Sequence, residues 1–339
     1  MKINMNKWLE ELKASSVKKA LPILSFPSVG LLGCSVREIT ADSDLQAQGM
    51  KLVADKTNSA ASVSLMDLSV EAECFGANAV FSDDEVPTIA KPLITDPEEV
   101  YDLVLPEVGT ARSGVYIDAI KKSVELICDR PIFAGVIGPY SLAARLMDME
   151  EIMINCYDEP EAVHALLEIC TEFIKNYCLA FKEAGANGVM MAEPVAGLLS
   201  PALAEEFSAP YVKQVVDAVQ DEEFLLIYHN CGDKTPLMLD SILSTGAAAY
   251  HFGNAIDMAK LMEKMPPDLL TMGNIDPAGI LRNGTPETVR TEMQKLLENC
   301  SKYPNFIPSS GCDIPPQTPW ENIDAFFKTV DDFYGKKEK

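Results

Sequence analysis

The chain has 339 residues, of which 47% are apolar and 23% are charged, a composition typical of a folded globular protein and too apolar for a disordered one. Lys and Arg total 28 against 51 Asp and Glu, so the formal net charge is −23 and most of the surface would repel a nucleic acid or an anionic membrane. Residues 1–13 contain two acids where a signal peptide needs an uninterrupted apolar stretch, and no later run reaches roughly 18 apolar residues. We therefore expect a cytoplasmic protein that binds neither nucleic acid nor membrane.

The nine cysteines are scattered along the chain, and an odd number without a secretory signal argues against a disulfide framework. Most of them are expected to be free thiols that pack in the core as small apolar side chains. Cys231 and Cys312 are the two that call for another interpretation.

The first 130 residues contain a helical apolar spacing over residues 1–13 and two strand candidates, Leu21–Phe26 and Ala61–Met66. The stretch from Gly76 to Arg130 is too long for a simple connection, and we expect it to be an insertion that lies over one end of the fold. The first half of the chain is therefore predicted to hold an N-terminal helical extension, two strands and an insertion.

From residue 131 onward, short apolar runs alternate with longer helical patterns, which is typical of βα units. Six strands are predicted: Pro131–Ile137, Gly188–Ala192, Phe224–Tyr228, Ala247–Tyr250, Leu269–Met272 and Asn305–Pro308. Helices are predicted after these strands, among them Asp158–Ala184 ending at Gly185, one capped by Ser200, one capped by Thr285, and a closing helix over Pro319–Phe333.

Two plus six strands make eight, and eight strands separated by helices predict a (β/α)8 barrel of the TIM type, formed by residues 1–339 as a single domain. An open, doubly wound sheet is the alternative, and it is disfavoured because no glycine-rich phosphate loop follows the first strand. Barrel enzymes place their reactive groups at the carboxyl ends of the strands. A functional site is therefore expected at these ends.

Two strand ends carry side chains that zinc prefers as ligands. His229 and Cys231 follow the strand Phe224–Tyr228 and lie two residues apart, so both can project into the barrel mouth if the chain is still extended there. Cys312 follows the last strand, and strand ends converge on one mouth. Two thiolates and an imidazole would leave a fourth position open, as in catalytic zinc sites. The alternative is two buried thiols and a hydrogen-bonded core histidine.

A resemblance to a known family rests on five segments: Met66–Glu73, Gly138–Ala143, His229–Gly232, Met272–Pro277 and Ser310–Asn322. These segments are similar to the uroporphyrinogen decarboxylase superfamily, in particular to its zinc-dependent methylcobalamin:coenzyme M methyltransferase branch, and the likeness covers nearly the whole chain. The resemblance implies that the His-X-Cys and distant Cys zinc ligands of that branch correspond to His229, Cys231 and Cys312.

One departure from the branch concerns the strand after His-X-Cys, where relatives carry a carboxylate as a further zinc ligand. The matching residues here are His251-Phe252-Gly253-Asn254, with no acid among them. We therefore expect three protein ligands plus water, with His251 or Glu193 as alternative fourth ligands. For His251 we favour contact with a ligand residue or with substrate.

Other polar residues after strands are candidates for binding substrate. Asp67 and Glu193 can line the mouth, where a carboxylate orients a ligand imidazole or a substrate, although a helix cap or a surface salt bridge explains either residue equally well. Asn274 is expected to contact substrate, or else Asp276 simply caps the next helix. With His251, these residues form the predicted substrate-binding set.

The resemblance implies transfer of a methyl group from methylcobalamin, a corrinoid, to a small-molecule thiol such as coenzyme M. Nothing in the chain resembles a corrinoid-binding module, so the corrinoid would be presented by a separate corrinoid protein docked over the barrel mouth. Coenzyme M needs a donor for its sulfonate, for which Arg145 is a candidate. The oligomeric state, including a homo-oligomer, stays open.

Three alternatives remain. A related corrinoid-dependent methyltransferase or demethylase would use the same zinc ligands with a different methyl donor or acceptor. Uroporphyrinogen decarboxylation is disfavoured, because its polycarboxylate substrate demands cations, whereas this chain has six arginines and none before Arg37, where the decarboxylases carry an arginine-rich motif. A non-catalytic corrinoid carrier is disfavoured by the intact His-Cys-Cys set.

Overall fold

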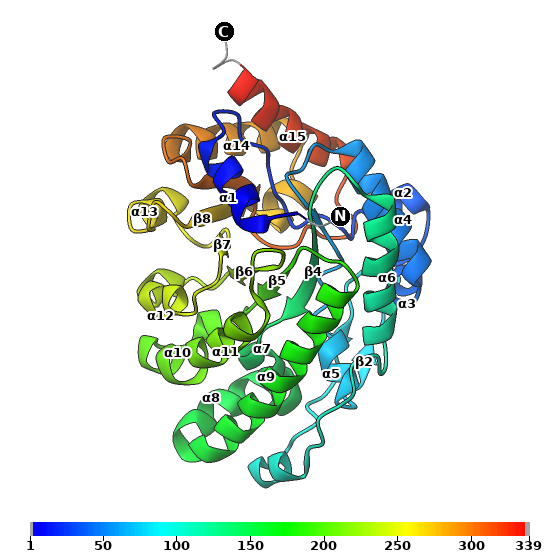
Figure 1. The fold of residues 1–339 in the computed structure, drawn as a ribbon, viewed down its shortest axis with the longest axis vertical. Helices are drawn as coiled ribbons and strands as arrows, with labels where there is room; N and C mark the ends of the chain where they lie inside the picture. Colours follow the sequence, from blue (N-terminus) through cyan, green and yellow to red (C-terminus); the bar gives the residue numbers. More distant parts are fainter. Residues whose placement is uncertain (1–2, 336–339) are drawn as a thin grey trace.

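Seven parallel strands form one curled sheet in the computed structural model, which describes residues 3–335 (Figure 1). Their order is β1 (Ser62–Val63), β4 (Ile132–Ile137), β5 (Gly188–Ala192), β6 (Leu225–Asn230), β7 (Ala249–Phe252), β8 (Leu270–Ile275) and β9 (Phe306–Ser310). Adjacent strands pair in parallel throughout. The six strands expected in the second half of the chain are confirmed, with ends that differ by a few residues.

Helices surround the sheet. The longer ones are α1 (Met5–Ala14), α4 (Ser43–Lys56), α6 (Ser113–Leu126), α7 (Pro139–Met147), α8 (Met149–Asp158), α9 (Pro160–Glu183), α11 (Ala209–Val219), α14 (Pro286–Cys300) and α15 (Trp320–Gly335). The shorter ones are α2 (Ser28–Leu32), α3 (Val36–Ala41), α5 (Val70–Cys74), η1 (Pro97–Asp102), η2 (Ala196–Leu198), α10 (Pro201–Phe207), η3 (Thr235–Leu237), α12 (Leu239–Ser244), α13 (Met258–Met262) and η4 (Pro277–Arg282). Within residues 3–335, no helix combines the length and apolar character that crossing a membrane would need.

An irregular segment, residues 20–24, occupies the eighth position of the barrel. The backbone N–H of Leu21 donates to the carbonyl of Pro308 in β9 at 3.0 Å, and the N–H of Ala60, just before β1, donates to the carbonyl of Ala20 at 2.9 Å. Pro22 and Pro308 have no backbone N–H, so a continuous ladder cannot form here. The strand expected over Leu21–Phe26 is therefore absent as regular structure, yet the segment closes the predicted (β/α)8 barrel.

The barrel interior is filled by side chains that alternate along each strand. In β6, Leu225 and Ile227 pack inside the barrel, while Leu226 and Tyr228 pack against the outer helices. Because successive side chains of a strand point to opposite faces, the odd-numbered parity of β6 also directs His229 inward. The expected strand over Phe224–Tyr228 extends to Asn230, so His229 belongs to the strand itself.

Helix α1 closes the amino-terminal end of the barrel. Its buried residues Met5, Trp8 and Leu9 join the interior cluster, with the Trp8 ring centroid 5.7 Å from that of Phe133. The N-terminal helical extension is thus confirmed from residue 5 onward, while residues 1–2 lie outside the described part of the chain. With one end plugged, the interior can open only at the carboxyl ends of the strands.

The insertion expected over Gly76–Arg130 has two parts. Residues 76–112 contain the short antiparallel strands β2 (Ala79–Val80) and β3 (Thr88–Ile89) together with η1, and the part around residues 85–88 reaches the barrel mouth. Helix α6, in contrast, packs against α4 and α9 in the outer layer of helices. The insertion over one end is therefore confirmed for its first part only.

Helix ends follow the expected local signals. Gly185 has φ +98°, and Ala186 donates to the carbonyl of Phe181 at 3.0 Å, so α9 ends in a Schellman motif at the expected glycine. Ser200 and Thr285 cap α10 and α14 with their side chains.

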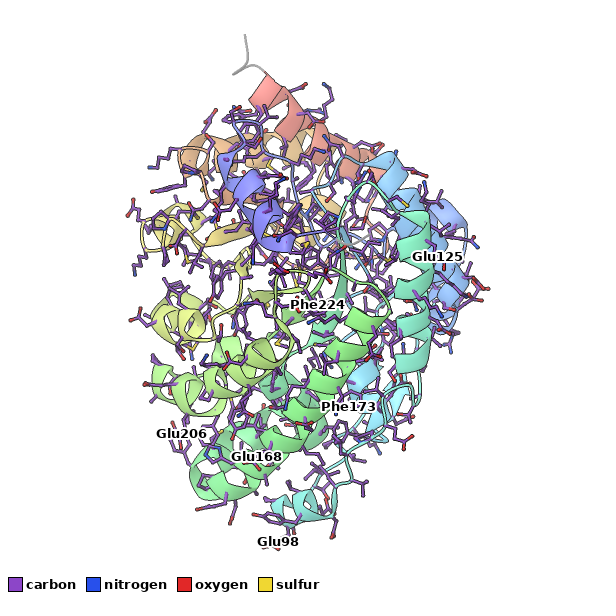
Figure 2. All side chains as sticks on the ribbon, viewed as in Figure 1. Glu98, Glu125, Glu168, Phe173, Glu206 and Phe224 are labelled. Carbon is purple, nitrogen blue, oxygen red and sulfur yellow. The ribbon has the colours of Figure 1, made fainter. Side chains whose placement is uncertain are left out.

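Exposed and buried side chains are separated as in a globular protein. In Figure 2, Glu98, Glu125 and Glu206 lie exposed at the periphery, whereas Phe173 and Phe224 are fully buried.

Candidate functional site

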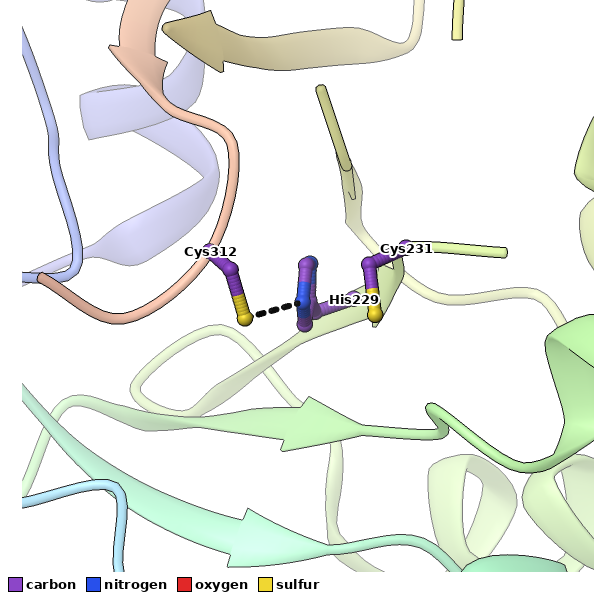
Figure 3. Close-up of side chains that lie close together, drawn as sticks. All are labelled: His229, Cys231 and Cys312. Atoms are coloured by element: carbon purple, nitrogen blue, oxygen red, sulfur yellow. Dashed lines mark hydrogen bonds between the residues drawn. The ribbon is translucent and has the colours of Figure 1, made fainter. Parts of the chain in front are cut away.

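His229, Cys231 and Cys312 come together at the carboxyl end of the barrel. One ligand atom from each of the three residues lies within 4.8 Å of the others, and the Sγ of Cys312 is 3.4 Å from the Nε2 of His229. Figure 3 shows the two thiols on either side of the imidazole, with the dashed line running to Cys312. His229 and Cys231 share the inward parity of β6, and the loop after β9 brings Cys312 across the mouth.

The three residues line a cavity of about 330 Å³. Its wall consists mainly of residues that follow strands β1, β5, β6 and β9, together with residues 85–88 of the insertion. The other lining residues are Met66, Leu68, Arg145, Ala192, Pro194, Arg282, Asp313, Pro315 and Pro316. The thiols and the imidazole thus face a mostly apolar space, into which two arginines and two acids also reach.

The two thiols are not equivalent. The neighbouring Cys312 and His229 lower the pKa of the Cys231 thiol. The interaction with Cys231, together with burial, raises the pKa of Cys312 well above its ordinary value. The two sulfurs therefore differ in how readily they lose a proton, and a cation bound between them would be stabilised by both as thiolates.

His251 lies beside His229 in the next strand and is fully buried. Its Nδ1 is 2.8 Å from the Nδ1 of His229, and its Nε2 is 2.8 Å from the Oγ of Ser309. Burial, with the adjacent His229, lowers the pKa of His251 well below its usual range, so the ring is neutral. His251 does not line the cavity and contacts the predicted ligand His229 instead.

Asp67 lies in a buried ion pair beside the cavity. Its Oδ2 is 2.5 Å from the guanidinium of Arg112 and accepts from the hydroxyl of Tyr116 at 2.8 Å, while Oδ1 accepts from the hydroxyl of Ser69 at 2.6 Å. Its neighbours Met66 and Leu68 line the cavity, but Asp67 does not. These contacts favour a salt bridge over substrate binding as the role of Asp67. The salt bridge is buried, whereas the sequence suggested one at the surface.

Glu193 points away from the barrel interior and caps helix α7. Its carboxylate accepts from the backbone N–H groups of Tyr140 and Ser141 at 3.0 and 2.9 Å and from the hydroxyl of Ser141 at 2.6 Å. Met190 and Ala192 of β5 face inward, so residue 193 faces the helices. Burial raises the pKa of Glu193 to about 7. The helix-cap alternative is therefore the one that the contacts favour.

Asn274 is separated from the three predicted zinc ligands. Its Nδ2 donates to the carbonyls of Gly253 and Ile256 at 2.8 and 2.7 Å, which fixes the loop after β7, and it lines a different cavity, between α13 and α14. Asp276 caps η4 by accepting from the N–H groups of Ala278 and Gly279. The structure thus brings His229, Cys231 and Cys312 together with His251 beside them, while Asp67, Glu193 and Asn274 have structural partners.

Arg145 on α7 is the cavity residue with the most unused hydrogen-bonding capacity. Within residues 3–335 its guanidinium has no hydrogen bond to protein and no carboxylate within 4.0 Å, whereas Arg112 pairs with Asp67 and Arg282 pairs with Glu85. Burial lowers the pKa of Arg145, and nearby Asp67 and Glu71 oppose this effect. Sequence reasoning named Arg145 only as a candidate, because its position depends on how α7 packs across the mouth.

The geometry of the three residues fits zinc. Bond lengths of about 2.3 Å to sulfur and about 2.0–2.1 Å to nitrogen place the ligand atoms of a tetrahedral site about 3.5–3.8 Å apart. The 3.4 Å between Cys312 Sγ and His229 Nε2 is close to that spacing, and all the ligand atoms of the set lie within 4.8 Å of one another. Two sulfurs and one nitrogen are also the donor set that zinc favours over hard, oxygen-binding cations.

Comparisons with known proteins agree on one family. The model of the uroporphyrinogen decarboxylase (URO-D) family matches residues 30–333. The chain is 30% identical over 261 residues to the methylcobamide:CoM methyltransferase MtbA of Methanosarcina acetivorans, covering 76% of this chain and 75% of that protein. It is 27% identical over 286 residues to the uroporphyrinogen decarboxylase of Nitrosomonas europaea, covering 80% of this chain and 78% of that protein.

A solved structure agrees with the barrel. The structure of a methyltransferase from Methanosarcina mazei has a TM-score of 0.86 and 22% sequence identity, and the match covers 98% of this chain and 99% of that one. At this identity the likeness concerns the fold.

Proposed function

The chain belongs to the uroporphyrinogen decarboxylase family, and within it we propose a zinc-dependent methyltransferase that moves a methyl group from a methyl-corrinoid to a thiol such as coenzyme M. The observation that carries the proposal is the convergence of His229, Cys231 and Cys312 on one cavity at the barrel mouth. The 30% identity to a methylcobamide:CoM methyltransferase supports the same reaction class. We further propose that residues 1–339 act as one domain, which the family match over residues 30–333 supports.

His229, Cys231 and Cys312 would hold the zinc through Nε2 and the two Sγ atoms, and all three residues line the cavity that a thiol substrate would enter. Zinc, when bound there, stabilises the deprotonated form of a thiol substrate and so supplies a nucleophile at neutral pH. Two cysteine thiolates offset the charge of the cation, which preserves the nucleophilicity of the substrate sulfur.

The reaction balances without a further reactant. The substrate sulfur forms a bond to the methyl carbon, the carbon–cobalt bond breaks, and its electron pair remains on cobalt as cob(I)alamin. The thiol proton leaves to solvent when the thiolate forms. The residues of this chain would hold the thiol in place. The apolar side chains of Met66, Leu68 and Ala192 would exclude water from it.

Arg145 would bind the acidic end of the thiol. A half-buried guanidinium with unpaired N–H groups is costly unless an anion meets it, and guanidinium–sulfonate contacts are charge-assisted hydrogen bonds. Arg145 and the two cysteines line the same cavity of about 330 Å³, so a short thiol can contact both. This arrangement supports coenzyme M or another small anionic thiol as the acceptor. The corrinoid would come from a separate corrinoid protein at the open side.

Uroporphyrinogen decarboxylation is the second candidate, because decarboxylases are among the relatives. A tetrapyrrole with many carboxylates requires many cations, yet the arginines that line this cavity are Arg145 and Arg282, and Arg282 is already paired with Glu85. The cavity therefore favours a small ligand with one acidic group. A related methyltransferase or demethylase with another methyl donor or acceptor would keep the same zinc ligands.

The test combines metal content with product formation. Wild-type protein, Cys231→Ser and Cys312→Ser are purified with zinc in the growth medium, zinc is measured by mass spectrometry, and each protein is incubated anaerobically with methylcobalamin and a panel of thiols. We expect about one zinc per wild-type chain, formation of cob(I)alamin and a methyl thioether, and loss of zinc and product in both variants. Cys34→Ser is the matched control, because Cys34 is likewise half-buried but does not line the cavity.

Two results would contradict the proposal. One is a folded wild-type protein that contains no zinc. The other is thiol methylation that survives in both cysteine variants. Uroporphyrinogen serves as a parallel substrate, and its decarboxylation by the wild-type protein would favour the second candidate.

A further inference from the structure

We propose that His251 and Ser309 fix the tautomer of His229, so that its proton lies on Nδ1 and the lone pair of Nε2 faces the two thiols. His251 is then a positioning residue that acts through His229. The inference rests on the proposed zinc site for its functional meaning, but the position of the proton follows from hydrogen bonds within the protein.

Four groups form a continuous chain of hydrogen bonds behind the site. The Oγ of Ser309 lies 2.7 Å from the carbonyl oxygen of Leu21, and the Nε2 of His251 lies 2.8 Å from the same Oγ. The Nδ1 of His251 lies 2.8 Å from the Nδ1 of His229. Beyond His229, its Nε2 faces the Sγ of Cys312 at 3.4 Å. The side chains of Ser309, His251 and His229 are each 1% exposed or less.

The direction of this chain is set at the backbone. A carbonyl can only accept, so the hydroxyl of Ser309 must donate its single hydrogen to Leu21. Ser309 then has only lone pairs left for His251, whose Nε2 must carry a hydrogen. A neutral imidazole with its hydrogen on Nε2 has a bare Nδ1, which accepts from His229. His229 therefore carries its hydrogen on Nδ1.

The opposite direction leaves groups without partners. If Ser309 donated to His251, the 2.7 Å contact between its oxygen and the carbonyl of Leu21 would join two acceptors. The backbone carbonyl of His251 also lies 3.3 Å from the Nδ1 of His229, a second acceptor that suits a protonated Nδ1. Both observations select the same tautomer.

The arrangement has a consequence for the charge of the site. Metal-bound histidines usually donate their other ring N–H to a carboxylate, a carbonyl or water. Here the acceptor is a neutral imidazole that is itself oriented by a hydroxyl and a backbone carbonyl. The ring of His229 is held in place without adding negative charge behind a site that already contains two thiols. A divalent cation with two thiolates is then formally neutral before an anionic thiol enters.

The ring protons can be observed directly, because the chain has three histidines. In metal-free protein labelled with 15N-histidine, NMR chemical shifts and couplings distinguish protonated from bare ring nitrogens. We expect a hydrogen on Nδ1 of His229 and on Nε2 of His251. His164 is the internal reference, since its Nδ1 meets the hydroxyl of Tyr211 at 2.7 Å, away from the site. A bare Nδ1 on His229 would overturn the inference.

Ser309→Ala and Ser310→Ala form a matched pair on β9. Both hydroxyls are fully buried, but that of Ser310 accepts from the backbone N–H of Ile23 and does not touch a histidine. We expect Ser309→Ala to lower zinc affinity by roughly 10–100-fold, the usual effect of losing an outer contact of a metal ligand, and to disturb the ring signals of His251. Ser310→Ala should leave both unchanged. Equal zinc affinities in the two variants would refute the inference.

Substitution of His251 separates hydrogen bonding from packing. His251→Asn keeps an acceptor near the place of Nδ1, whereas His251→Leu removes it. Zinc affinity, measured by competition with a chromophoric chelator, should fall in the Leu variant and recover largely in the Asn variant. Equal loss in both would contradict a positioning role. If the ring protons lie as stated but wild-type protein binds no zinc, the proposed function fails while the tautomer assignment stands.

Discussion

Glu71 offers a quantitative test of how burial acts beside the cavity. It lies in the first turn of α5 and is 1% exposed; its Oε1 accepts from the backbone N–H of Ile137 at 3.0 Å, and its Oε2 has no hydrogen-bond partner within residues 3–335. Burial is the main cause that raises the pKa of this carboxyl from 4.5 to about 7. Glu71→Gln keeps the accepting oxygen and replaces the unpaired one by an uncharged amide.

The magnitude follows from linkage between protonation and folding. An unfolded chain ionises Glu71 near pH 4.5, while the folded protein keeps it protonated until about pH 7. The contribution of Glu71 to the free energy of unfolding is therefore greatest below pH 4.5 and is lost as the pH rises through 7, because the unfolded state releases the Glu71 proton first. A difference of about 2.5 pH units, at about 1.4 kcal/mol for each, amounts to about 3 kcal/mol. Glu71→Gln has no ionisable group at this position, so its free energy of unfolding should not fall in this way as the pH rises.

Urea unfolding between pH 5 and pH 8, followed by circular dichroism, measures the effect. The variant and wild type are compared by their free energies of unfolding. We expect the difference between the two to shift by about 2–3 kcal/mol in favour of Glu71→Gln as the pH rises from 5 to 8. Glu125→Gln on the exposed face of α6 is the control and should track wild type. If Glu71→Gln and wild type changed in parallel with pH, the carboxyl would be ionised in the folded protein and the reasoning would be refuted.

Two further predictions concern the cavity and its supporting shell. Arg145→Gln should raise KM for coenzyme M by roughly 10-fold or more through loss of charge-assisted hydrogen bonds, with little change for an uncharged thiol; equal effects on both thiols would contradict an anion-binding role. Gly138→Ala places a Cβ against the carboxyl of Glu193 and should destabilise the protein by about 1–3 kcal/mol in chemical denaturation, whereas Gly30→Ala, whose nearest neighbour is 4.0 Å away, should be nearly neutral.

The sequence predicts the barrel well because its strands and helices have clear periods. Short apolar runs bounded by turns correspond to β4 through β9, and Gly185, Ser200 and Thr285 mark helix ends by local backbone chemistry. The segment over residues 21–26 is different. Its apolar pattern suits a strand, but Pro22 and the facing Pro308 prevent a ladder, and only the closed barrel brings them together.

The candidate site is predicted in part for the same reason. His229, Cys231 and Cys312 stand out because strand ends of a barrel share one mouth, so local spacing and fold class are sufficient. Glu193 could have been assigned as a cap, because the alternation of β5 already directs residue 193 outward. The contacts of His251 depend on the register between β6, β7 and β9, which the sequence does not specify.

The irregular eighth position of the barrel also has a kinetic consequence. Residues 20–24 join β9 to β1 without a continuous ladder, so this seam should open locally at a lower free energy than the rest of the sheet. The carbonyl of Leu21 belongs to the seam and is the fixed end of the hydrogen bonds that reach His229. Local opening of the seam is therefore expected to loosen the orientation of the imidazole. If the proposed zinc site is correct, the rate of zinc release should rise with the rate of amide hydrogen exchange at Leu21, a residue far from the site in the chain.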